Sequence, residues 1–195
     1  MRKPNLFTIS AIAAFSFATA GCMTMNDDMA MGDEQIAYVD GAAMYPSKNI
    51  VENAMNSPVH TTLVAAVKQA GLVDTLMGPG PFTVFAPTDA AFARVPEATR
   101  NSLMMDQNRA QLQKVLTYHV VPGRITAADL MSRIEAGNGR AMIKTVEGED
   151  LTFMIENGNV MLMGKGGSSA FVTQADVMQS NGVIHVVNGV LTPTL

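Results

Sequence analysis

Histidine is the side chain that most often acts as acid, base or metal ligand near neutral pH, and the chain has three: His60, His119 and His185. None belongs to an HxH or HExxH pattern, the spacings that place two ligands on one metal ion. His119 falls on the apolar stripe of an expected helix, and His185 lies between Ile184 and Val186 of an expected strand. Both patterns favour buried structural histidines, so we expect no metal site and no cofactor.

Asp89 is the other candidate for acid–base chemistry. It follows Thr88 at the start of an expected helix, where a carboxylate is favoured by about 0.3–1 kcal/mol without any catalytic role. We therefore predict that Thr88, Asp89, His119 and His185 form a buried polar brace that joins distant parts of the chain. The alternative is a cryptic hydrolase that uses Ser168 or Ser169 with His185, although the sequence contains no Gly-x-Ser-x-Gly nucleophile elbow.

A short segment near the middle of the sequence organises the elements that would hold these residues. Phe82 to Ala86 is β-prone with an aromatic residue on each face, which predicts a strand covered on both sides. Pro87 ends that strand, and Thr88 can cap the helix that follows.

The rest of the chain divides into a helical first half and a sheet-rich second half, which indicates the α+β class. Asn157-Gly158 is the strongest hairpin signal. The expected helices cover 47–55, 58–70, 97–104, 106–119 and 126–135, and the expected strands cover 141–146, 151–156, 159–163, 171–178 and 183–187.

Residues 1–22 are predicted to be a signal peptide of the lipoprotein type, because Arg2 and Lys3 precede an apolar stretch that is too short to span a membrane. Gly21-Cys22 resembles a lipobox, in which Cys22 is the lipidation site, and it contains the single cysteine of the chain. Ordinary cleavage after Ala18-Thr-Ala20 is the competing route. Either route exports the protein, to a lipid-anchored position in the cell envelope or to the periplasm or outside.

Residues 23–45 are expected to be a flexible, acidic, methionine-rich tether, and residues 46–195 the folded domain. The 16 methionines of the chain raise the alternative of a soft-metal or oxidant-handling protein. Without Arg2 and Lys3, 11 of the 13 basic residues remain against 17 acidic ones, a formal charge of −6. This charge argues against nucleic acid as a partner, and it leaves the N-terminal lipid as the expected contact with the membrane.

Three segments resemble the signature blocks of the fasciclin domain family: Thr83-Val-Phe-Ala-Pro-Thr-Asp-Ala-Ala-Phe92, Tyr118-His-Val-Val-Pro-Gly123 and Asn181-Gly-Val-Ile-His-Val-Val-Asn-Gly-Val-Leu-Thr-Pro193. They occur in the family's order over roughly residues 46–195. Asn188 departs from the acidic residue that many members carry. The resemblance implies the fasciclin wedge, a β-sandwich-like core with helices packed along one side, in a bacterial, single-domain, exported member.

The resemblance also implies a function outside the cell, since the family generally serves adhesion. We expect a non-enzymatic adhesion or binding module whose partner is a protein or polysaccharide on a neighbouring cell, the matrix or the envelope. Tyr118 and His119 lie in the block that is associated with integrin recognition in animal relatives. They are therefore the candidate contact with a partner.

Overall fold

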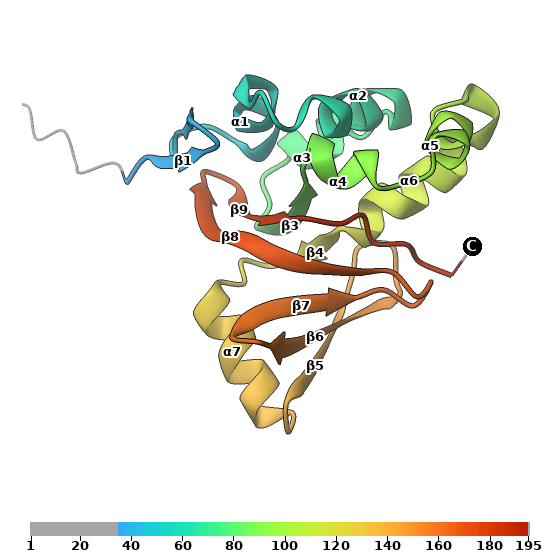
Figure 1. The fold of residues 1–195 in the computed structure, drawn as a ribbon. Coiled ribbons are helices and arrows are strands. Elements are labelled where there is room, and N and C mark those ends of the chain that lie inside the picture. Colours follow the sequence, from blue (N-terminus) through green and yellow to red (C-terminus); the bar gives the residue numbers. More distant parts are fainter. Residues whose placement is uncertain (1–34, 195) are drawn as a thin grey trace, which may run out of the picture. The chain divides into compact units, whose positions relative to one another are not determined.

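The computed structural model describes residues 35–194 (Figure 1). The signal peptide, Cys22 and the first part of the predicted tether lie outside these residues. The helices are α1 (Ile50–Asn56), α2 (Thr61–Ala70), α3 (Val73–Met77), α4 (Asp89–Ala93), α5 (Glu97–Leu103), the 3₁₀ turn η1 (Asp106–Asn108), α6 (Arg109–Tyr118) and α7 (Ala127–Ala136).

The strands form one hairpin and one larger mixed sheet. The hairpin pairs β1 (Ala37–Val39) with β2 (Ala42–Met44), and the larger sheet has the order β4-β3-β9-β8-β7-β6-β5. The members of that sheet are β3 (Phe82–Pro87), β4 (Val120–Pro122), β5 (Arg140–Lys144), β6 (Asp150–Glu156), β7 (Asn159–Met163), β8 (Ser169–Gln179) and β9 (Gly182–Val187).

The three signature blocks meet in this sheet. The strand of the first block, β3, pairs antiparallel with β4 of the second and parallel with β9 of the third. Its residues after Phe82 are all buried, as expected for a strand covered on both faces. Contacts between segments about a hundred residues apart therefore hold the middle of the fold.

Two apolar cores lie on opposite sides of the β4-β3-β9 layer. On one side Val84, Val120 and Ile184 pack against α1, α2 and α6. On the other side Phe85 packs with Phe153 and with the inward residues of β5–β8 and α7. Figure 1 shows α1–α6 gathered along one side of the sheet and α7 alone beside β5 and β6. This arrangement confirms the predicted α+β fold with a β-sandwich-like core.

The long strand β8 allows the sheet to fold over its second core. Its pairing with β9 is irregular between Val172 and Gln174 and again before Val177, and such bulges bend a strand. The two edges of the sheet also meet. The Val146 amide, just after the edge strand β5, donates to the Val120 carbonyl of the other edge strand, β4, at 2.7 Å.

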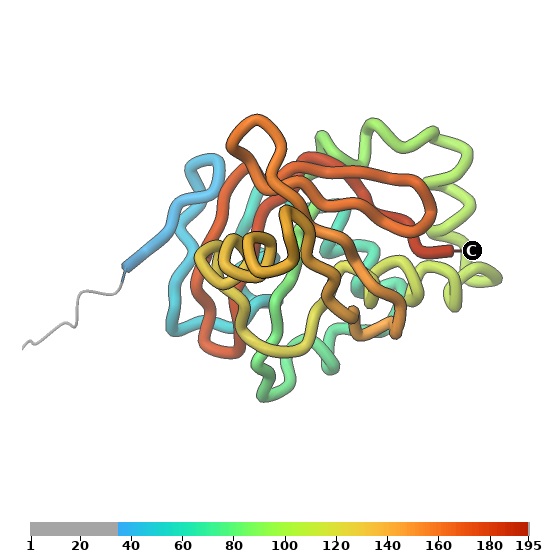
Figure 2. Tube along the Cα trace, turned by 90° about the horizontal axis from the view of Figure 1, so that it is seen from below, coloured from blue at the N-terminus to red at the C-terminus, as the bar shows by residue number. Residues whose placement is uncertain are grey.

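The structure corrects the predicted start of the domain at residue 46. Residues 37–44 form the β1–β2 hairpin instead of a tether, and Val39 and Met44 are buried in the first core. Gln174 on β8 donates to the Tyr38 carbonyl at 2.9 Å, which fixes the hairpin beside β8 (Figure 2). The sequence signal for this hairpin was the dipeptide Asp40-Gly41, which favours a type I′ turn. Both residues have the positive φ that this turn requires.

Within residues 35–194, none of the helices has the length and apolar character needed to cross a bilayer.

Candidate functional site

His119 sits at the C-terminal end of α6 and is buried. The Leu191 amide donates to its Nε2 at 2.9 Å, so its Nδ1 carries the proton and donates to the Val115 carbonyl at 2.8 Å. Burial lowers the pKa of His119 to about 4, and the bond to Val115 opposes this only partly. The ring is therefore neutral at physiological pH and has no free nitrogen for catalysis.

His185 is likewise inaccessible, with 0% of its surface exposed. Its Nε2 donates to the Ile125 carbonyl at 2.9 Å, and its Nδ1 accepts from the Asp176 amide at 3.3 Å. Burial lowers the pKa of His185, against the smaller opposing effects of Ile125 and Asp176. The ring also stacks on Phe85, with 5.4 Å between centroids.

The two histidines do link the signature blocks, as the predicted brace requires, but they do so by bonding backbone atoms. The third side chain that takes part is Thr83, in place of Thr88 and Asp89. The Thr83 hydroxyl accepts from the Ile125 amide at 2.9 Å and donates to the Gly123 carbonyl at 2.7 Å. The segment 123–125, which leaves the second block, is thus held by Thr83 of the first block and His185 of the third.

Thr88 and Asp89 lie elsewhere and begin helices. The Thr88 hydroxyl caps α4 by accepting from the Ala91 amide. Asp89 accepts from the amides of Thr61 and Thr62 at 3.2 and 2.8 Å, at the start of α2. Desolvation raises the pKa of Asp89, but the hydrogen bonds from Thr62 and Thr61 together outweigh it, so the pKa is lowered. Among the described hydrogen bonds, none links Thr88 or Asp89 to His119 or His185, so the four residues do not form one brace.

The structure also corrects the proposed partner contact at Tyr118 and His119. Tyr118 has 0% of its surface exposed, and its hydroxyl donates to the Asp150 carbonyl at 3.1 Å and accepts from the Lys165 amide at 3.0 Å. Both side chains hold the interior together, so neither can contact a partner in this conformation.

The hydrolase alternative fails on the geometry of its candidate dyad. The Ser168 hydroxyl accepts from the Thr192 amide at 2.7 Å and lies 3.1 Å from the Thr192 hydroxyl. The His185 ring is bonded to backbone on both nitrogens, so it cannot activate Ser168 or Ser169. Among residues 35–194, no group of three or more His, Cys, Asp or Glu residues could hold a metal ion.

The outward face of the β5–β8 part of the sheet has a different character. The strand registers place its residues in two rows, one of Arg140, Met154, Met161 and Phe171 and one of Met142, Thr152, Met163 and Ser169. We call this set the methionine face. Met142 is 63% exposed and Met163 is 40% exposed, while Met154, Met161 and Phe171 are half-buried.

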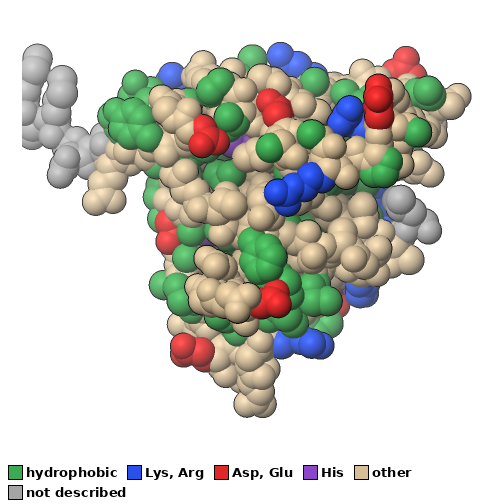
Figure 3. Space-filling model, in the orientation of Figure 1, with side chains coloured by type: hydrophobic (Ala, Val, Ile, Leu, Met, Phe, Trp, Pro, Cys, Tyr) green, Lys and Arg blue, Asp and Glu red, His purple; other side chains and the backbone are tan. Residues whose placement is uncertain are grey.

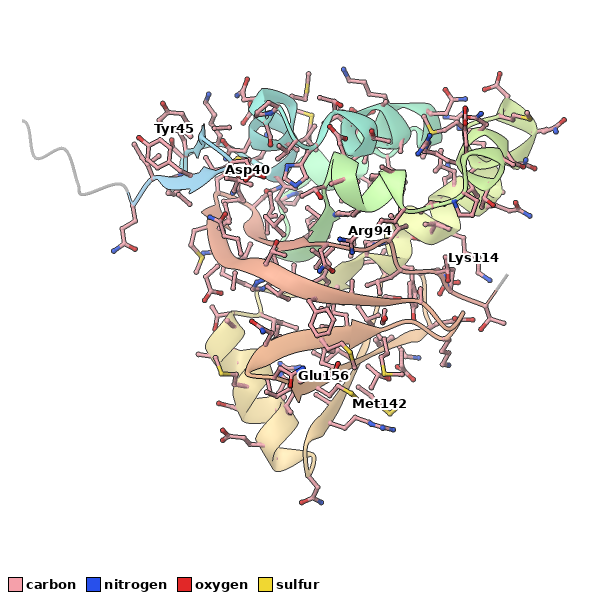
Figure 4. The ribbon with its side chains drawn as sticks, in the orientation of Figure 1. Asp40, Tyr45, Arg94, Lys114, Met142 and Glu156 are labelled. Carbon is pink, nitrogen blue, oxygen red and sulfur yellow. The ribbon has the colours of Figure 1, made fainter. Side chains whose placement is uncertain are left out.

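The methionine face remains uncovered in the described part of the chain. Figure 3 shows hydrophobic side chains over this region with an acidic group among them and basic ones beside them, and Figure 4 labels Glu156 there and shows Met142 among further sulfur atoms near β6 and β7. Unbranched thioether side chains adapt to irregular surfaces, and they are frequent at protein-binding sites. The face therefore has the composition of a contact surface for another macromolecule.

The sequence analysis missed this face, because it considered the abundant methionines in the tether and as candidates for soft-metal or oxidant handling. A signal was present in the hairpin at Asn157-Gly158. Its register pairs Met154 with Met161, while the alternating residues Phe153 and Leu162 are buried. An inward aromatic–aliphatic row thus alternates with an outward methionine row.

Comparisons with known proteins agree with this architecture. The fasciclin domain profile matches residues 58–193. Protein sll1483 of Synechocystis is 42% identical over 192 residues, which cover 96% of this chain and 99% of that protein. The cell surface glycolipoprotein MPB83 of Mycobacterium bovis is 33% identical over 160 residues, which cover 80% of this chain and 64% of that protein.

A FAS1 domain pair from the insect cell adhesion molecule fasciclin I has a similar fold, with a TM-score of 0.65 and 19% identity. The match covers 82% of this chain and 57% of that one. The chain belongs to the fasciclin domain family.

Asn188, the departure from the family pattern, still supplies an acceptor. Its side-chain Oδ1 accepts from the Phe171 amide at 2.9 Å, and its backbone amide donates to the Phe171 carbonyl at 3.1 Å. Arg94, labelled in Figure 4, donates to the Asn188 carbonyl. An amide oxygen is therefore sufficient for the local hydrogen bonding at this position.

Proposed function

We propose that the protein is a non-enzymatic adhesion module that binds a protein on a neighbouring cell, in the matrix or in the envelope through its methionine face. The observation that carries the proposal is the surface of four methionines and Phe171 on the outward side of β5–β8. Family membership and the adhesion role of the insect protein support the same function.

The chemistry of the face favours a protein over a polysaccharide as partner. Sugar binding relies on directed hydrogen bonds, whereas this face offers four methionines and one aromatic ring, with Thr152 and Ser169 as its uncharged polar members. Protein interfaces are enriched in methionine and aromatic residues at their centres and are polar at their rims. Lys144 and Glu156 are exposed around this face and would form such a rim together with Arg140, the charged member at the end of its first row.

For the location, we propose display on the cell envelope through a lipid on Cys22. The lipobox-like Gly21-Cys22 supports this proposal, as does the resemblance to a mycobacterial cell surface glycolipoprotein. Mass spectrometry of the mature N-terminus would test it: an acylated Cys22 is expected, and a free N-terminus before Cys22 would contradict it.

The adhesion proposal is tested by binding of the purified protein to the envelope fraction of its own cells, with Met163→Glu as the variant. A charge in the middle of the face should lower binding at least tenfold, because it must be desolvated on contact. Met131→Glu is the matched control, since Met131 is 46% exposed on α7, outside the face.

Three outcomes of this assay would count against the proposal. Equal binding by Met163→Glu and the wild type would exclude the face. Binding that survives protease treatment of the envelope would indicate a polysaccharide partner. Loss of self-association in Met163→Glu, without any loss of envelope binding, would indicate a second copy of the chain as the occupant.

The methionine face also supports a second candidate, the binding of a soft metal ion. Thioethers are ligands for Cu(I), and Met154, Met161 and Met163 are neighbours on two paired strands. Replacing all three by Leu separates the two functions, because Leu keeps the apolar surface but removes the sulfur. Cu(I) binding should disappear in that variant if the face holds the metal, whereas unchanged binding would dismiss this candidate.

A further inference from the structure

A cavity of about 380 Å³ lies on the opposite, helical side of the domain. Residues of α2, α4, α5 and α6 line it together with Val190 and Thr192, which follow β9. Its apolar wall includes Phe92, Leu103, Met104, Leu112, Val115 and Leu116. This volume falls within the range of about 300–1,000 Å³ that is usual for small-molecule sites.

Helix α5 is unusual among the described helices that border the cavity. None of its residues is buried, although Leu103 lines the cavity and Ala98 stands at its rim. Figure 1 shows α5 at the outer end of the helical layer, beside α6. Leu103 packs against the helical core and also lines the cavity, so the space beside α5 has an apolar wall that a ligand could fill.

Within the described part of the chain, the lining of the cavity contains no carboxylate and no cysteine, and its histidine is not available as an acid or base. His119 contributes its ring, but both ring nitrogens are bonded to backbone, and the low pKa keeps the ring neutral. This composition suits binding without chemical conversion.

Arg100 is the charged residue in the lining. It is half-buried, and one Nη donates to the Phe92 carbonyl at 3.2 Å. Within residues 35–194 no acidic group forms an ion pair with it, not even Glu97 one turn earlier on α5. A guanidinium carries five N–H donors, and its fork matches the two oxygens of a carboxylate.

We propose that this cavity binds a free fatty acid, with the aliphatic chain among the apolar residues of α4, α5 and α6 and the carboxylate on Arg100. The apolar wall accounts for the chain, and the guanidinium without an acidic partner accounts for the charge of the head group. The site is separate from the methionine face, so Met163→Glu should leave fatty-acid binding unchanged.

The test is titration of the delipidated protein with palmitate, methyl palmitate and palmitoyl lysophosphatidylcholine by calorimetry. We expect one palmitate per chain. Arg100→Gln should weaken palmitate at least tenfold, because a charge-assisted bidentate contact is lost, and it should leave methyl palmitate unchanged. Arg133→Gln, an exposed arginine on α7, is the matched control and should bind palmitate like the wild type.

A second pair of variants tests the cavity itself. Ala98→Trp introduces a large ring at its rim on a surface-exposed helix, and it should weaken palmitate and methyl palmitate alike. Ala136→Trp makes the same change at an exposed position of α7 and should have no effect.

No palmitate binding by the wild type would overturn the proposal. So would equal palmitate affinities of the wild type and Arg100→Gln, or of Ala98→Trp and Ala136→Trp. Binding of lysophosphatidylcholine as tight as that of palmitate would overturn the assignment of a carboxylate head group.

Discussion

At the scale of single residues, the polar groups of the three signature blocks serve the interior. The rings of His119 and His185 each bond two backbone groups, and the Tyr118 hydroxyl bonds two more. A buried backbone group without a partner is costly. The role of these three side chains in the fold is therefore explained without any contact with a ligand.

Replacing His119 by Ala should lower the free energy of unfolding by about 1–3 kcal/mol, because the Leu191 amide and the Val115 carbonyl lose their partner inside the protein. Urea denaturation at pH 7 measures the difference. A variant that unfolds at the same urea concentration as the wild type would show that these two bonds contribute nothing.

The histidines also predict how stability depends on pH. Burial lowers the pKa of His60, His119 and His185 in the folded state, against the smaller effects of Asp89 and Asp40 on His60. Below pH 6.5, and down to about pH 4 for His119, the unfolded chain therefore binds more protons at these groups than the folded one. Above pH 6.5 the three histidines cost no stability, and the free energy of unfolding falls as the pH falls below that value. For His119 the loss is up to about 1.4 kcal/mol per pH unit between pH 6.5 and about 4.

Urea denaturation at pH 7, 6 and 5 checks this dependence, and these values lie above the pH at which most carboxylates titrate. The slope should be smaller in His119→Ala, which has one histidine fewer. Stability that stays constant from pH 7 to 5 would contradict the lowered pKa values of the three histidines.

At the scale of elements, local signals predicted most of the secondary structure. Gly71 ends α2 with a positive φ, Thr126 and Asp129 form the capping box of α7, and Asn157-Gly158 turns the β6–β7 hairpin. The end of α2, the start of α7 and the hairpin turn lie where the sequence predicted them, whereas α2 begins later than predicted. Each signal acts within four residues. Signals of such short range can therefore be recognised in a single sequence.

The elements that the sequence placed wrongly depend on partners far along the chain. Helix α2 begins at Thr61 instead of near Pro58, because Asp89, 28 residues later, accepts from its first amides. The β1–β2 hairpin is too short to be stable alone, and its burial against α1 and β8 stabilises it. Neither partner can be recognised by a local pattern.

Asn181 is a further long-range contact, and it predicts a large effect of one substitution. Its Oδ1 accepts from the Ile50 amide at 3.0 Å, and its Nδ2 donates to the carbonyls of Leu76 and Gly78. Asn181→Ala leaves these buried groups unpaired, so we expect a loss of at least about 2 kcal/mol in the free energy of unfolding. Asn159→Ala, at an exposed hairpin position, should change it by less than about 0.5 kcal/mol. Similar losses in the two variants would show that Asn181 does not join α1 and α3 to the sheet.

At the scale of the whole domain, the sheet and the helices present two different surfaces. The signature blocks predicted the fold because they are the three strands that meet in its centre. They did not predict the candidate site, since the methionine face forms only when β5, β6, β7 and β8 lie in register. The residues most typical of the family are thus inside, and the proposed contact lies on strands outside the blocks.

Oxidative footprinting of methionines tests the central claim, that this face meets the partner, most directly. The protein is treated with hydrogen peroxide free in solution and bound to the envelope fraction, and methionine sulfoxide is quantified by mass spectrometry. Met77, Met105 and Met131 are internal controls, because they are exposed on the helical parts of the domain.

We predict that binding protects Met142 and Met163, which are exposed in the free protein, and leaves the three control methionines as reactive as before. Protection of Met77 or Met105, with Met142 and Met163 still freely oxidised, would place the contact on the helices and contradict the account.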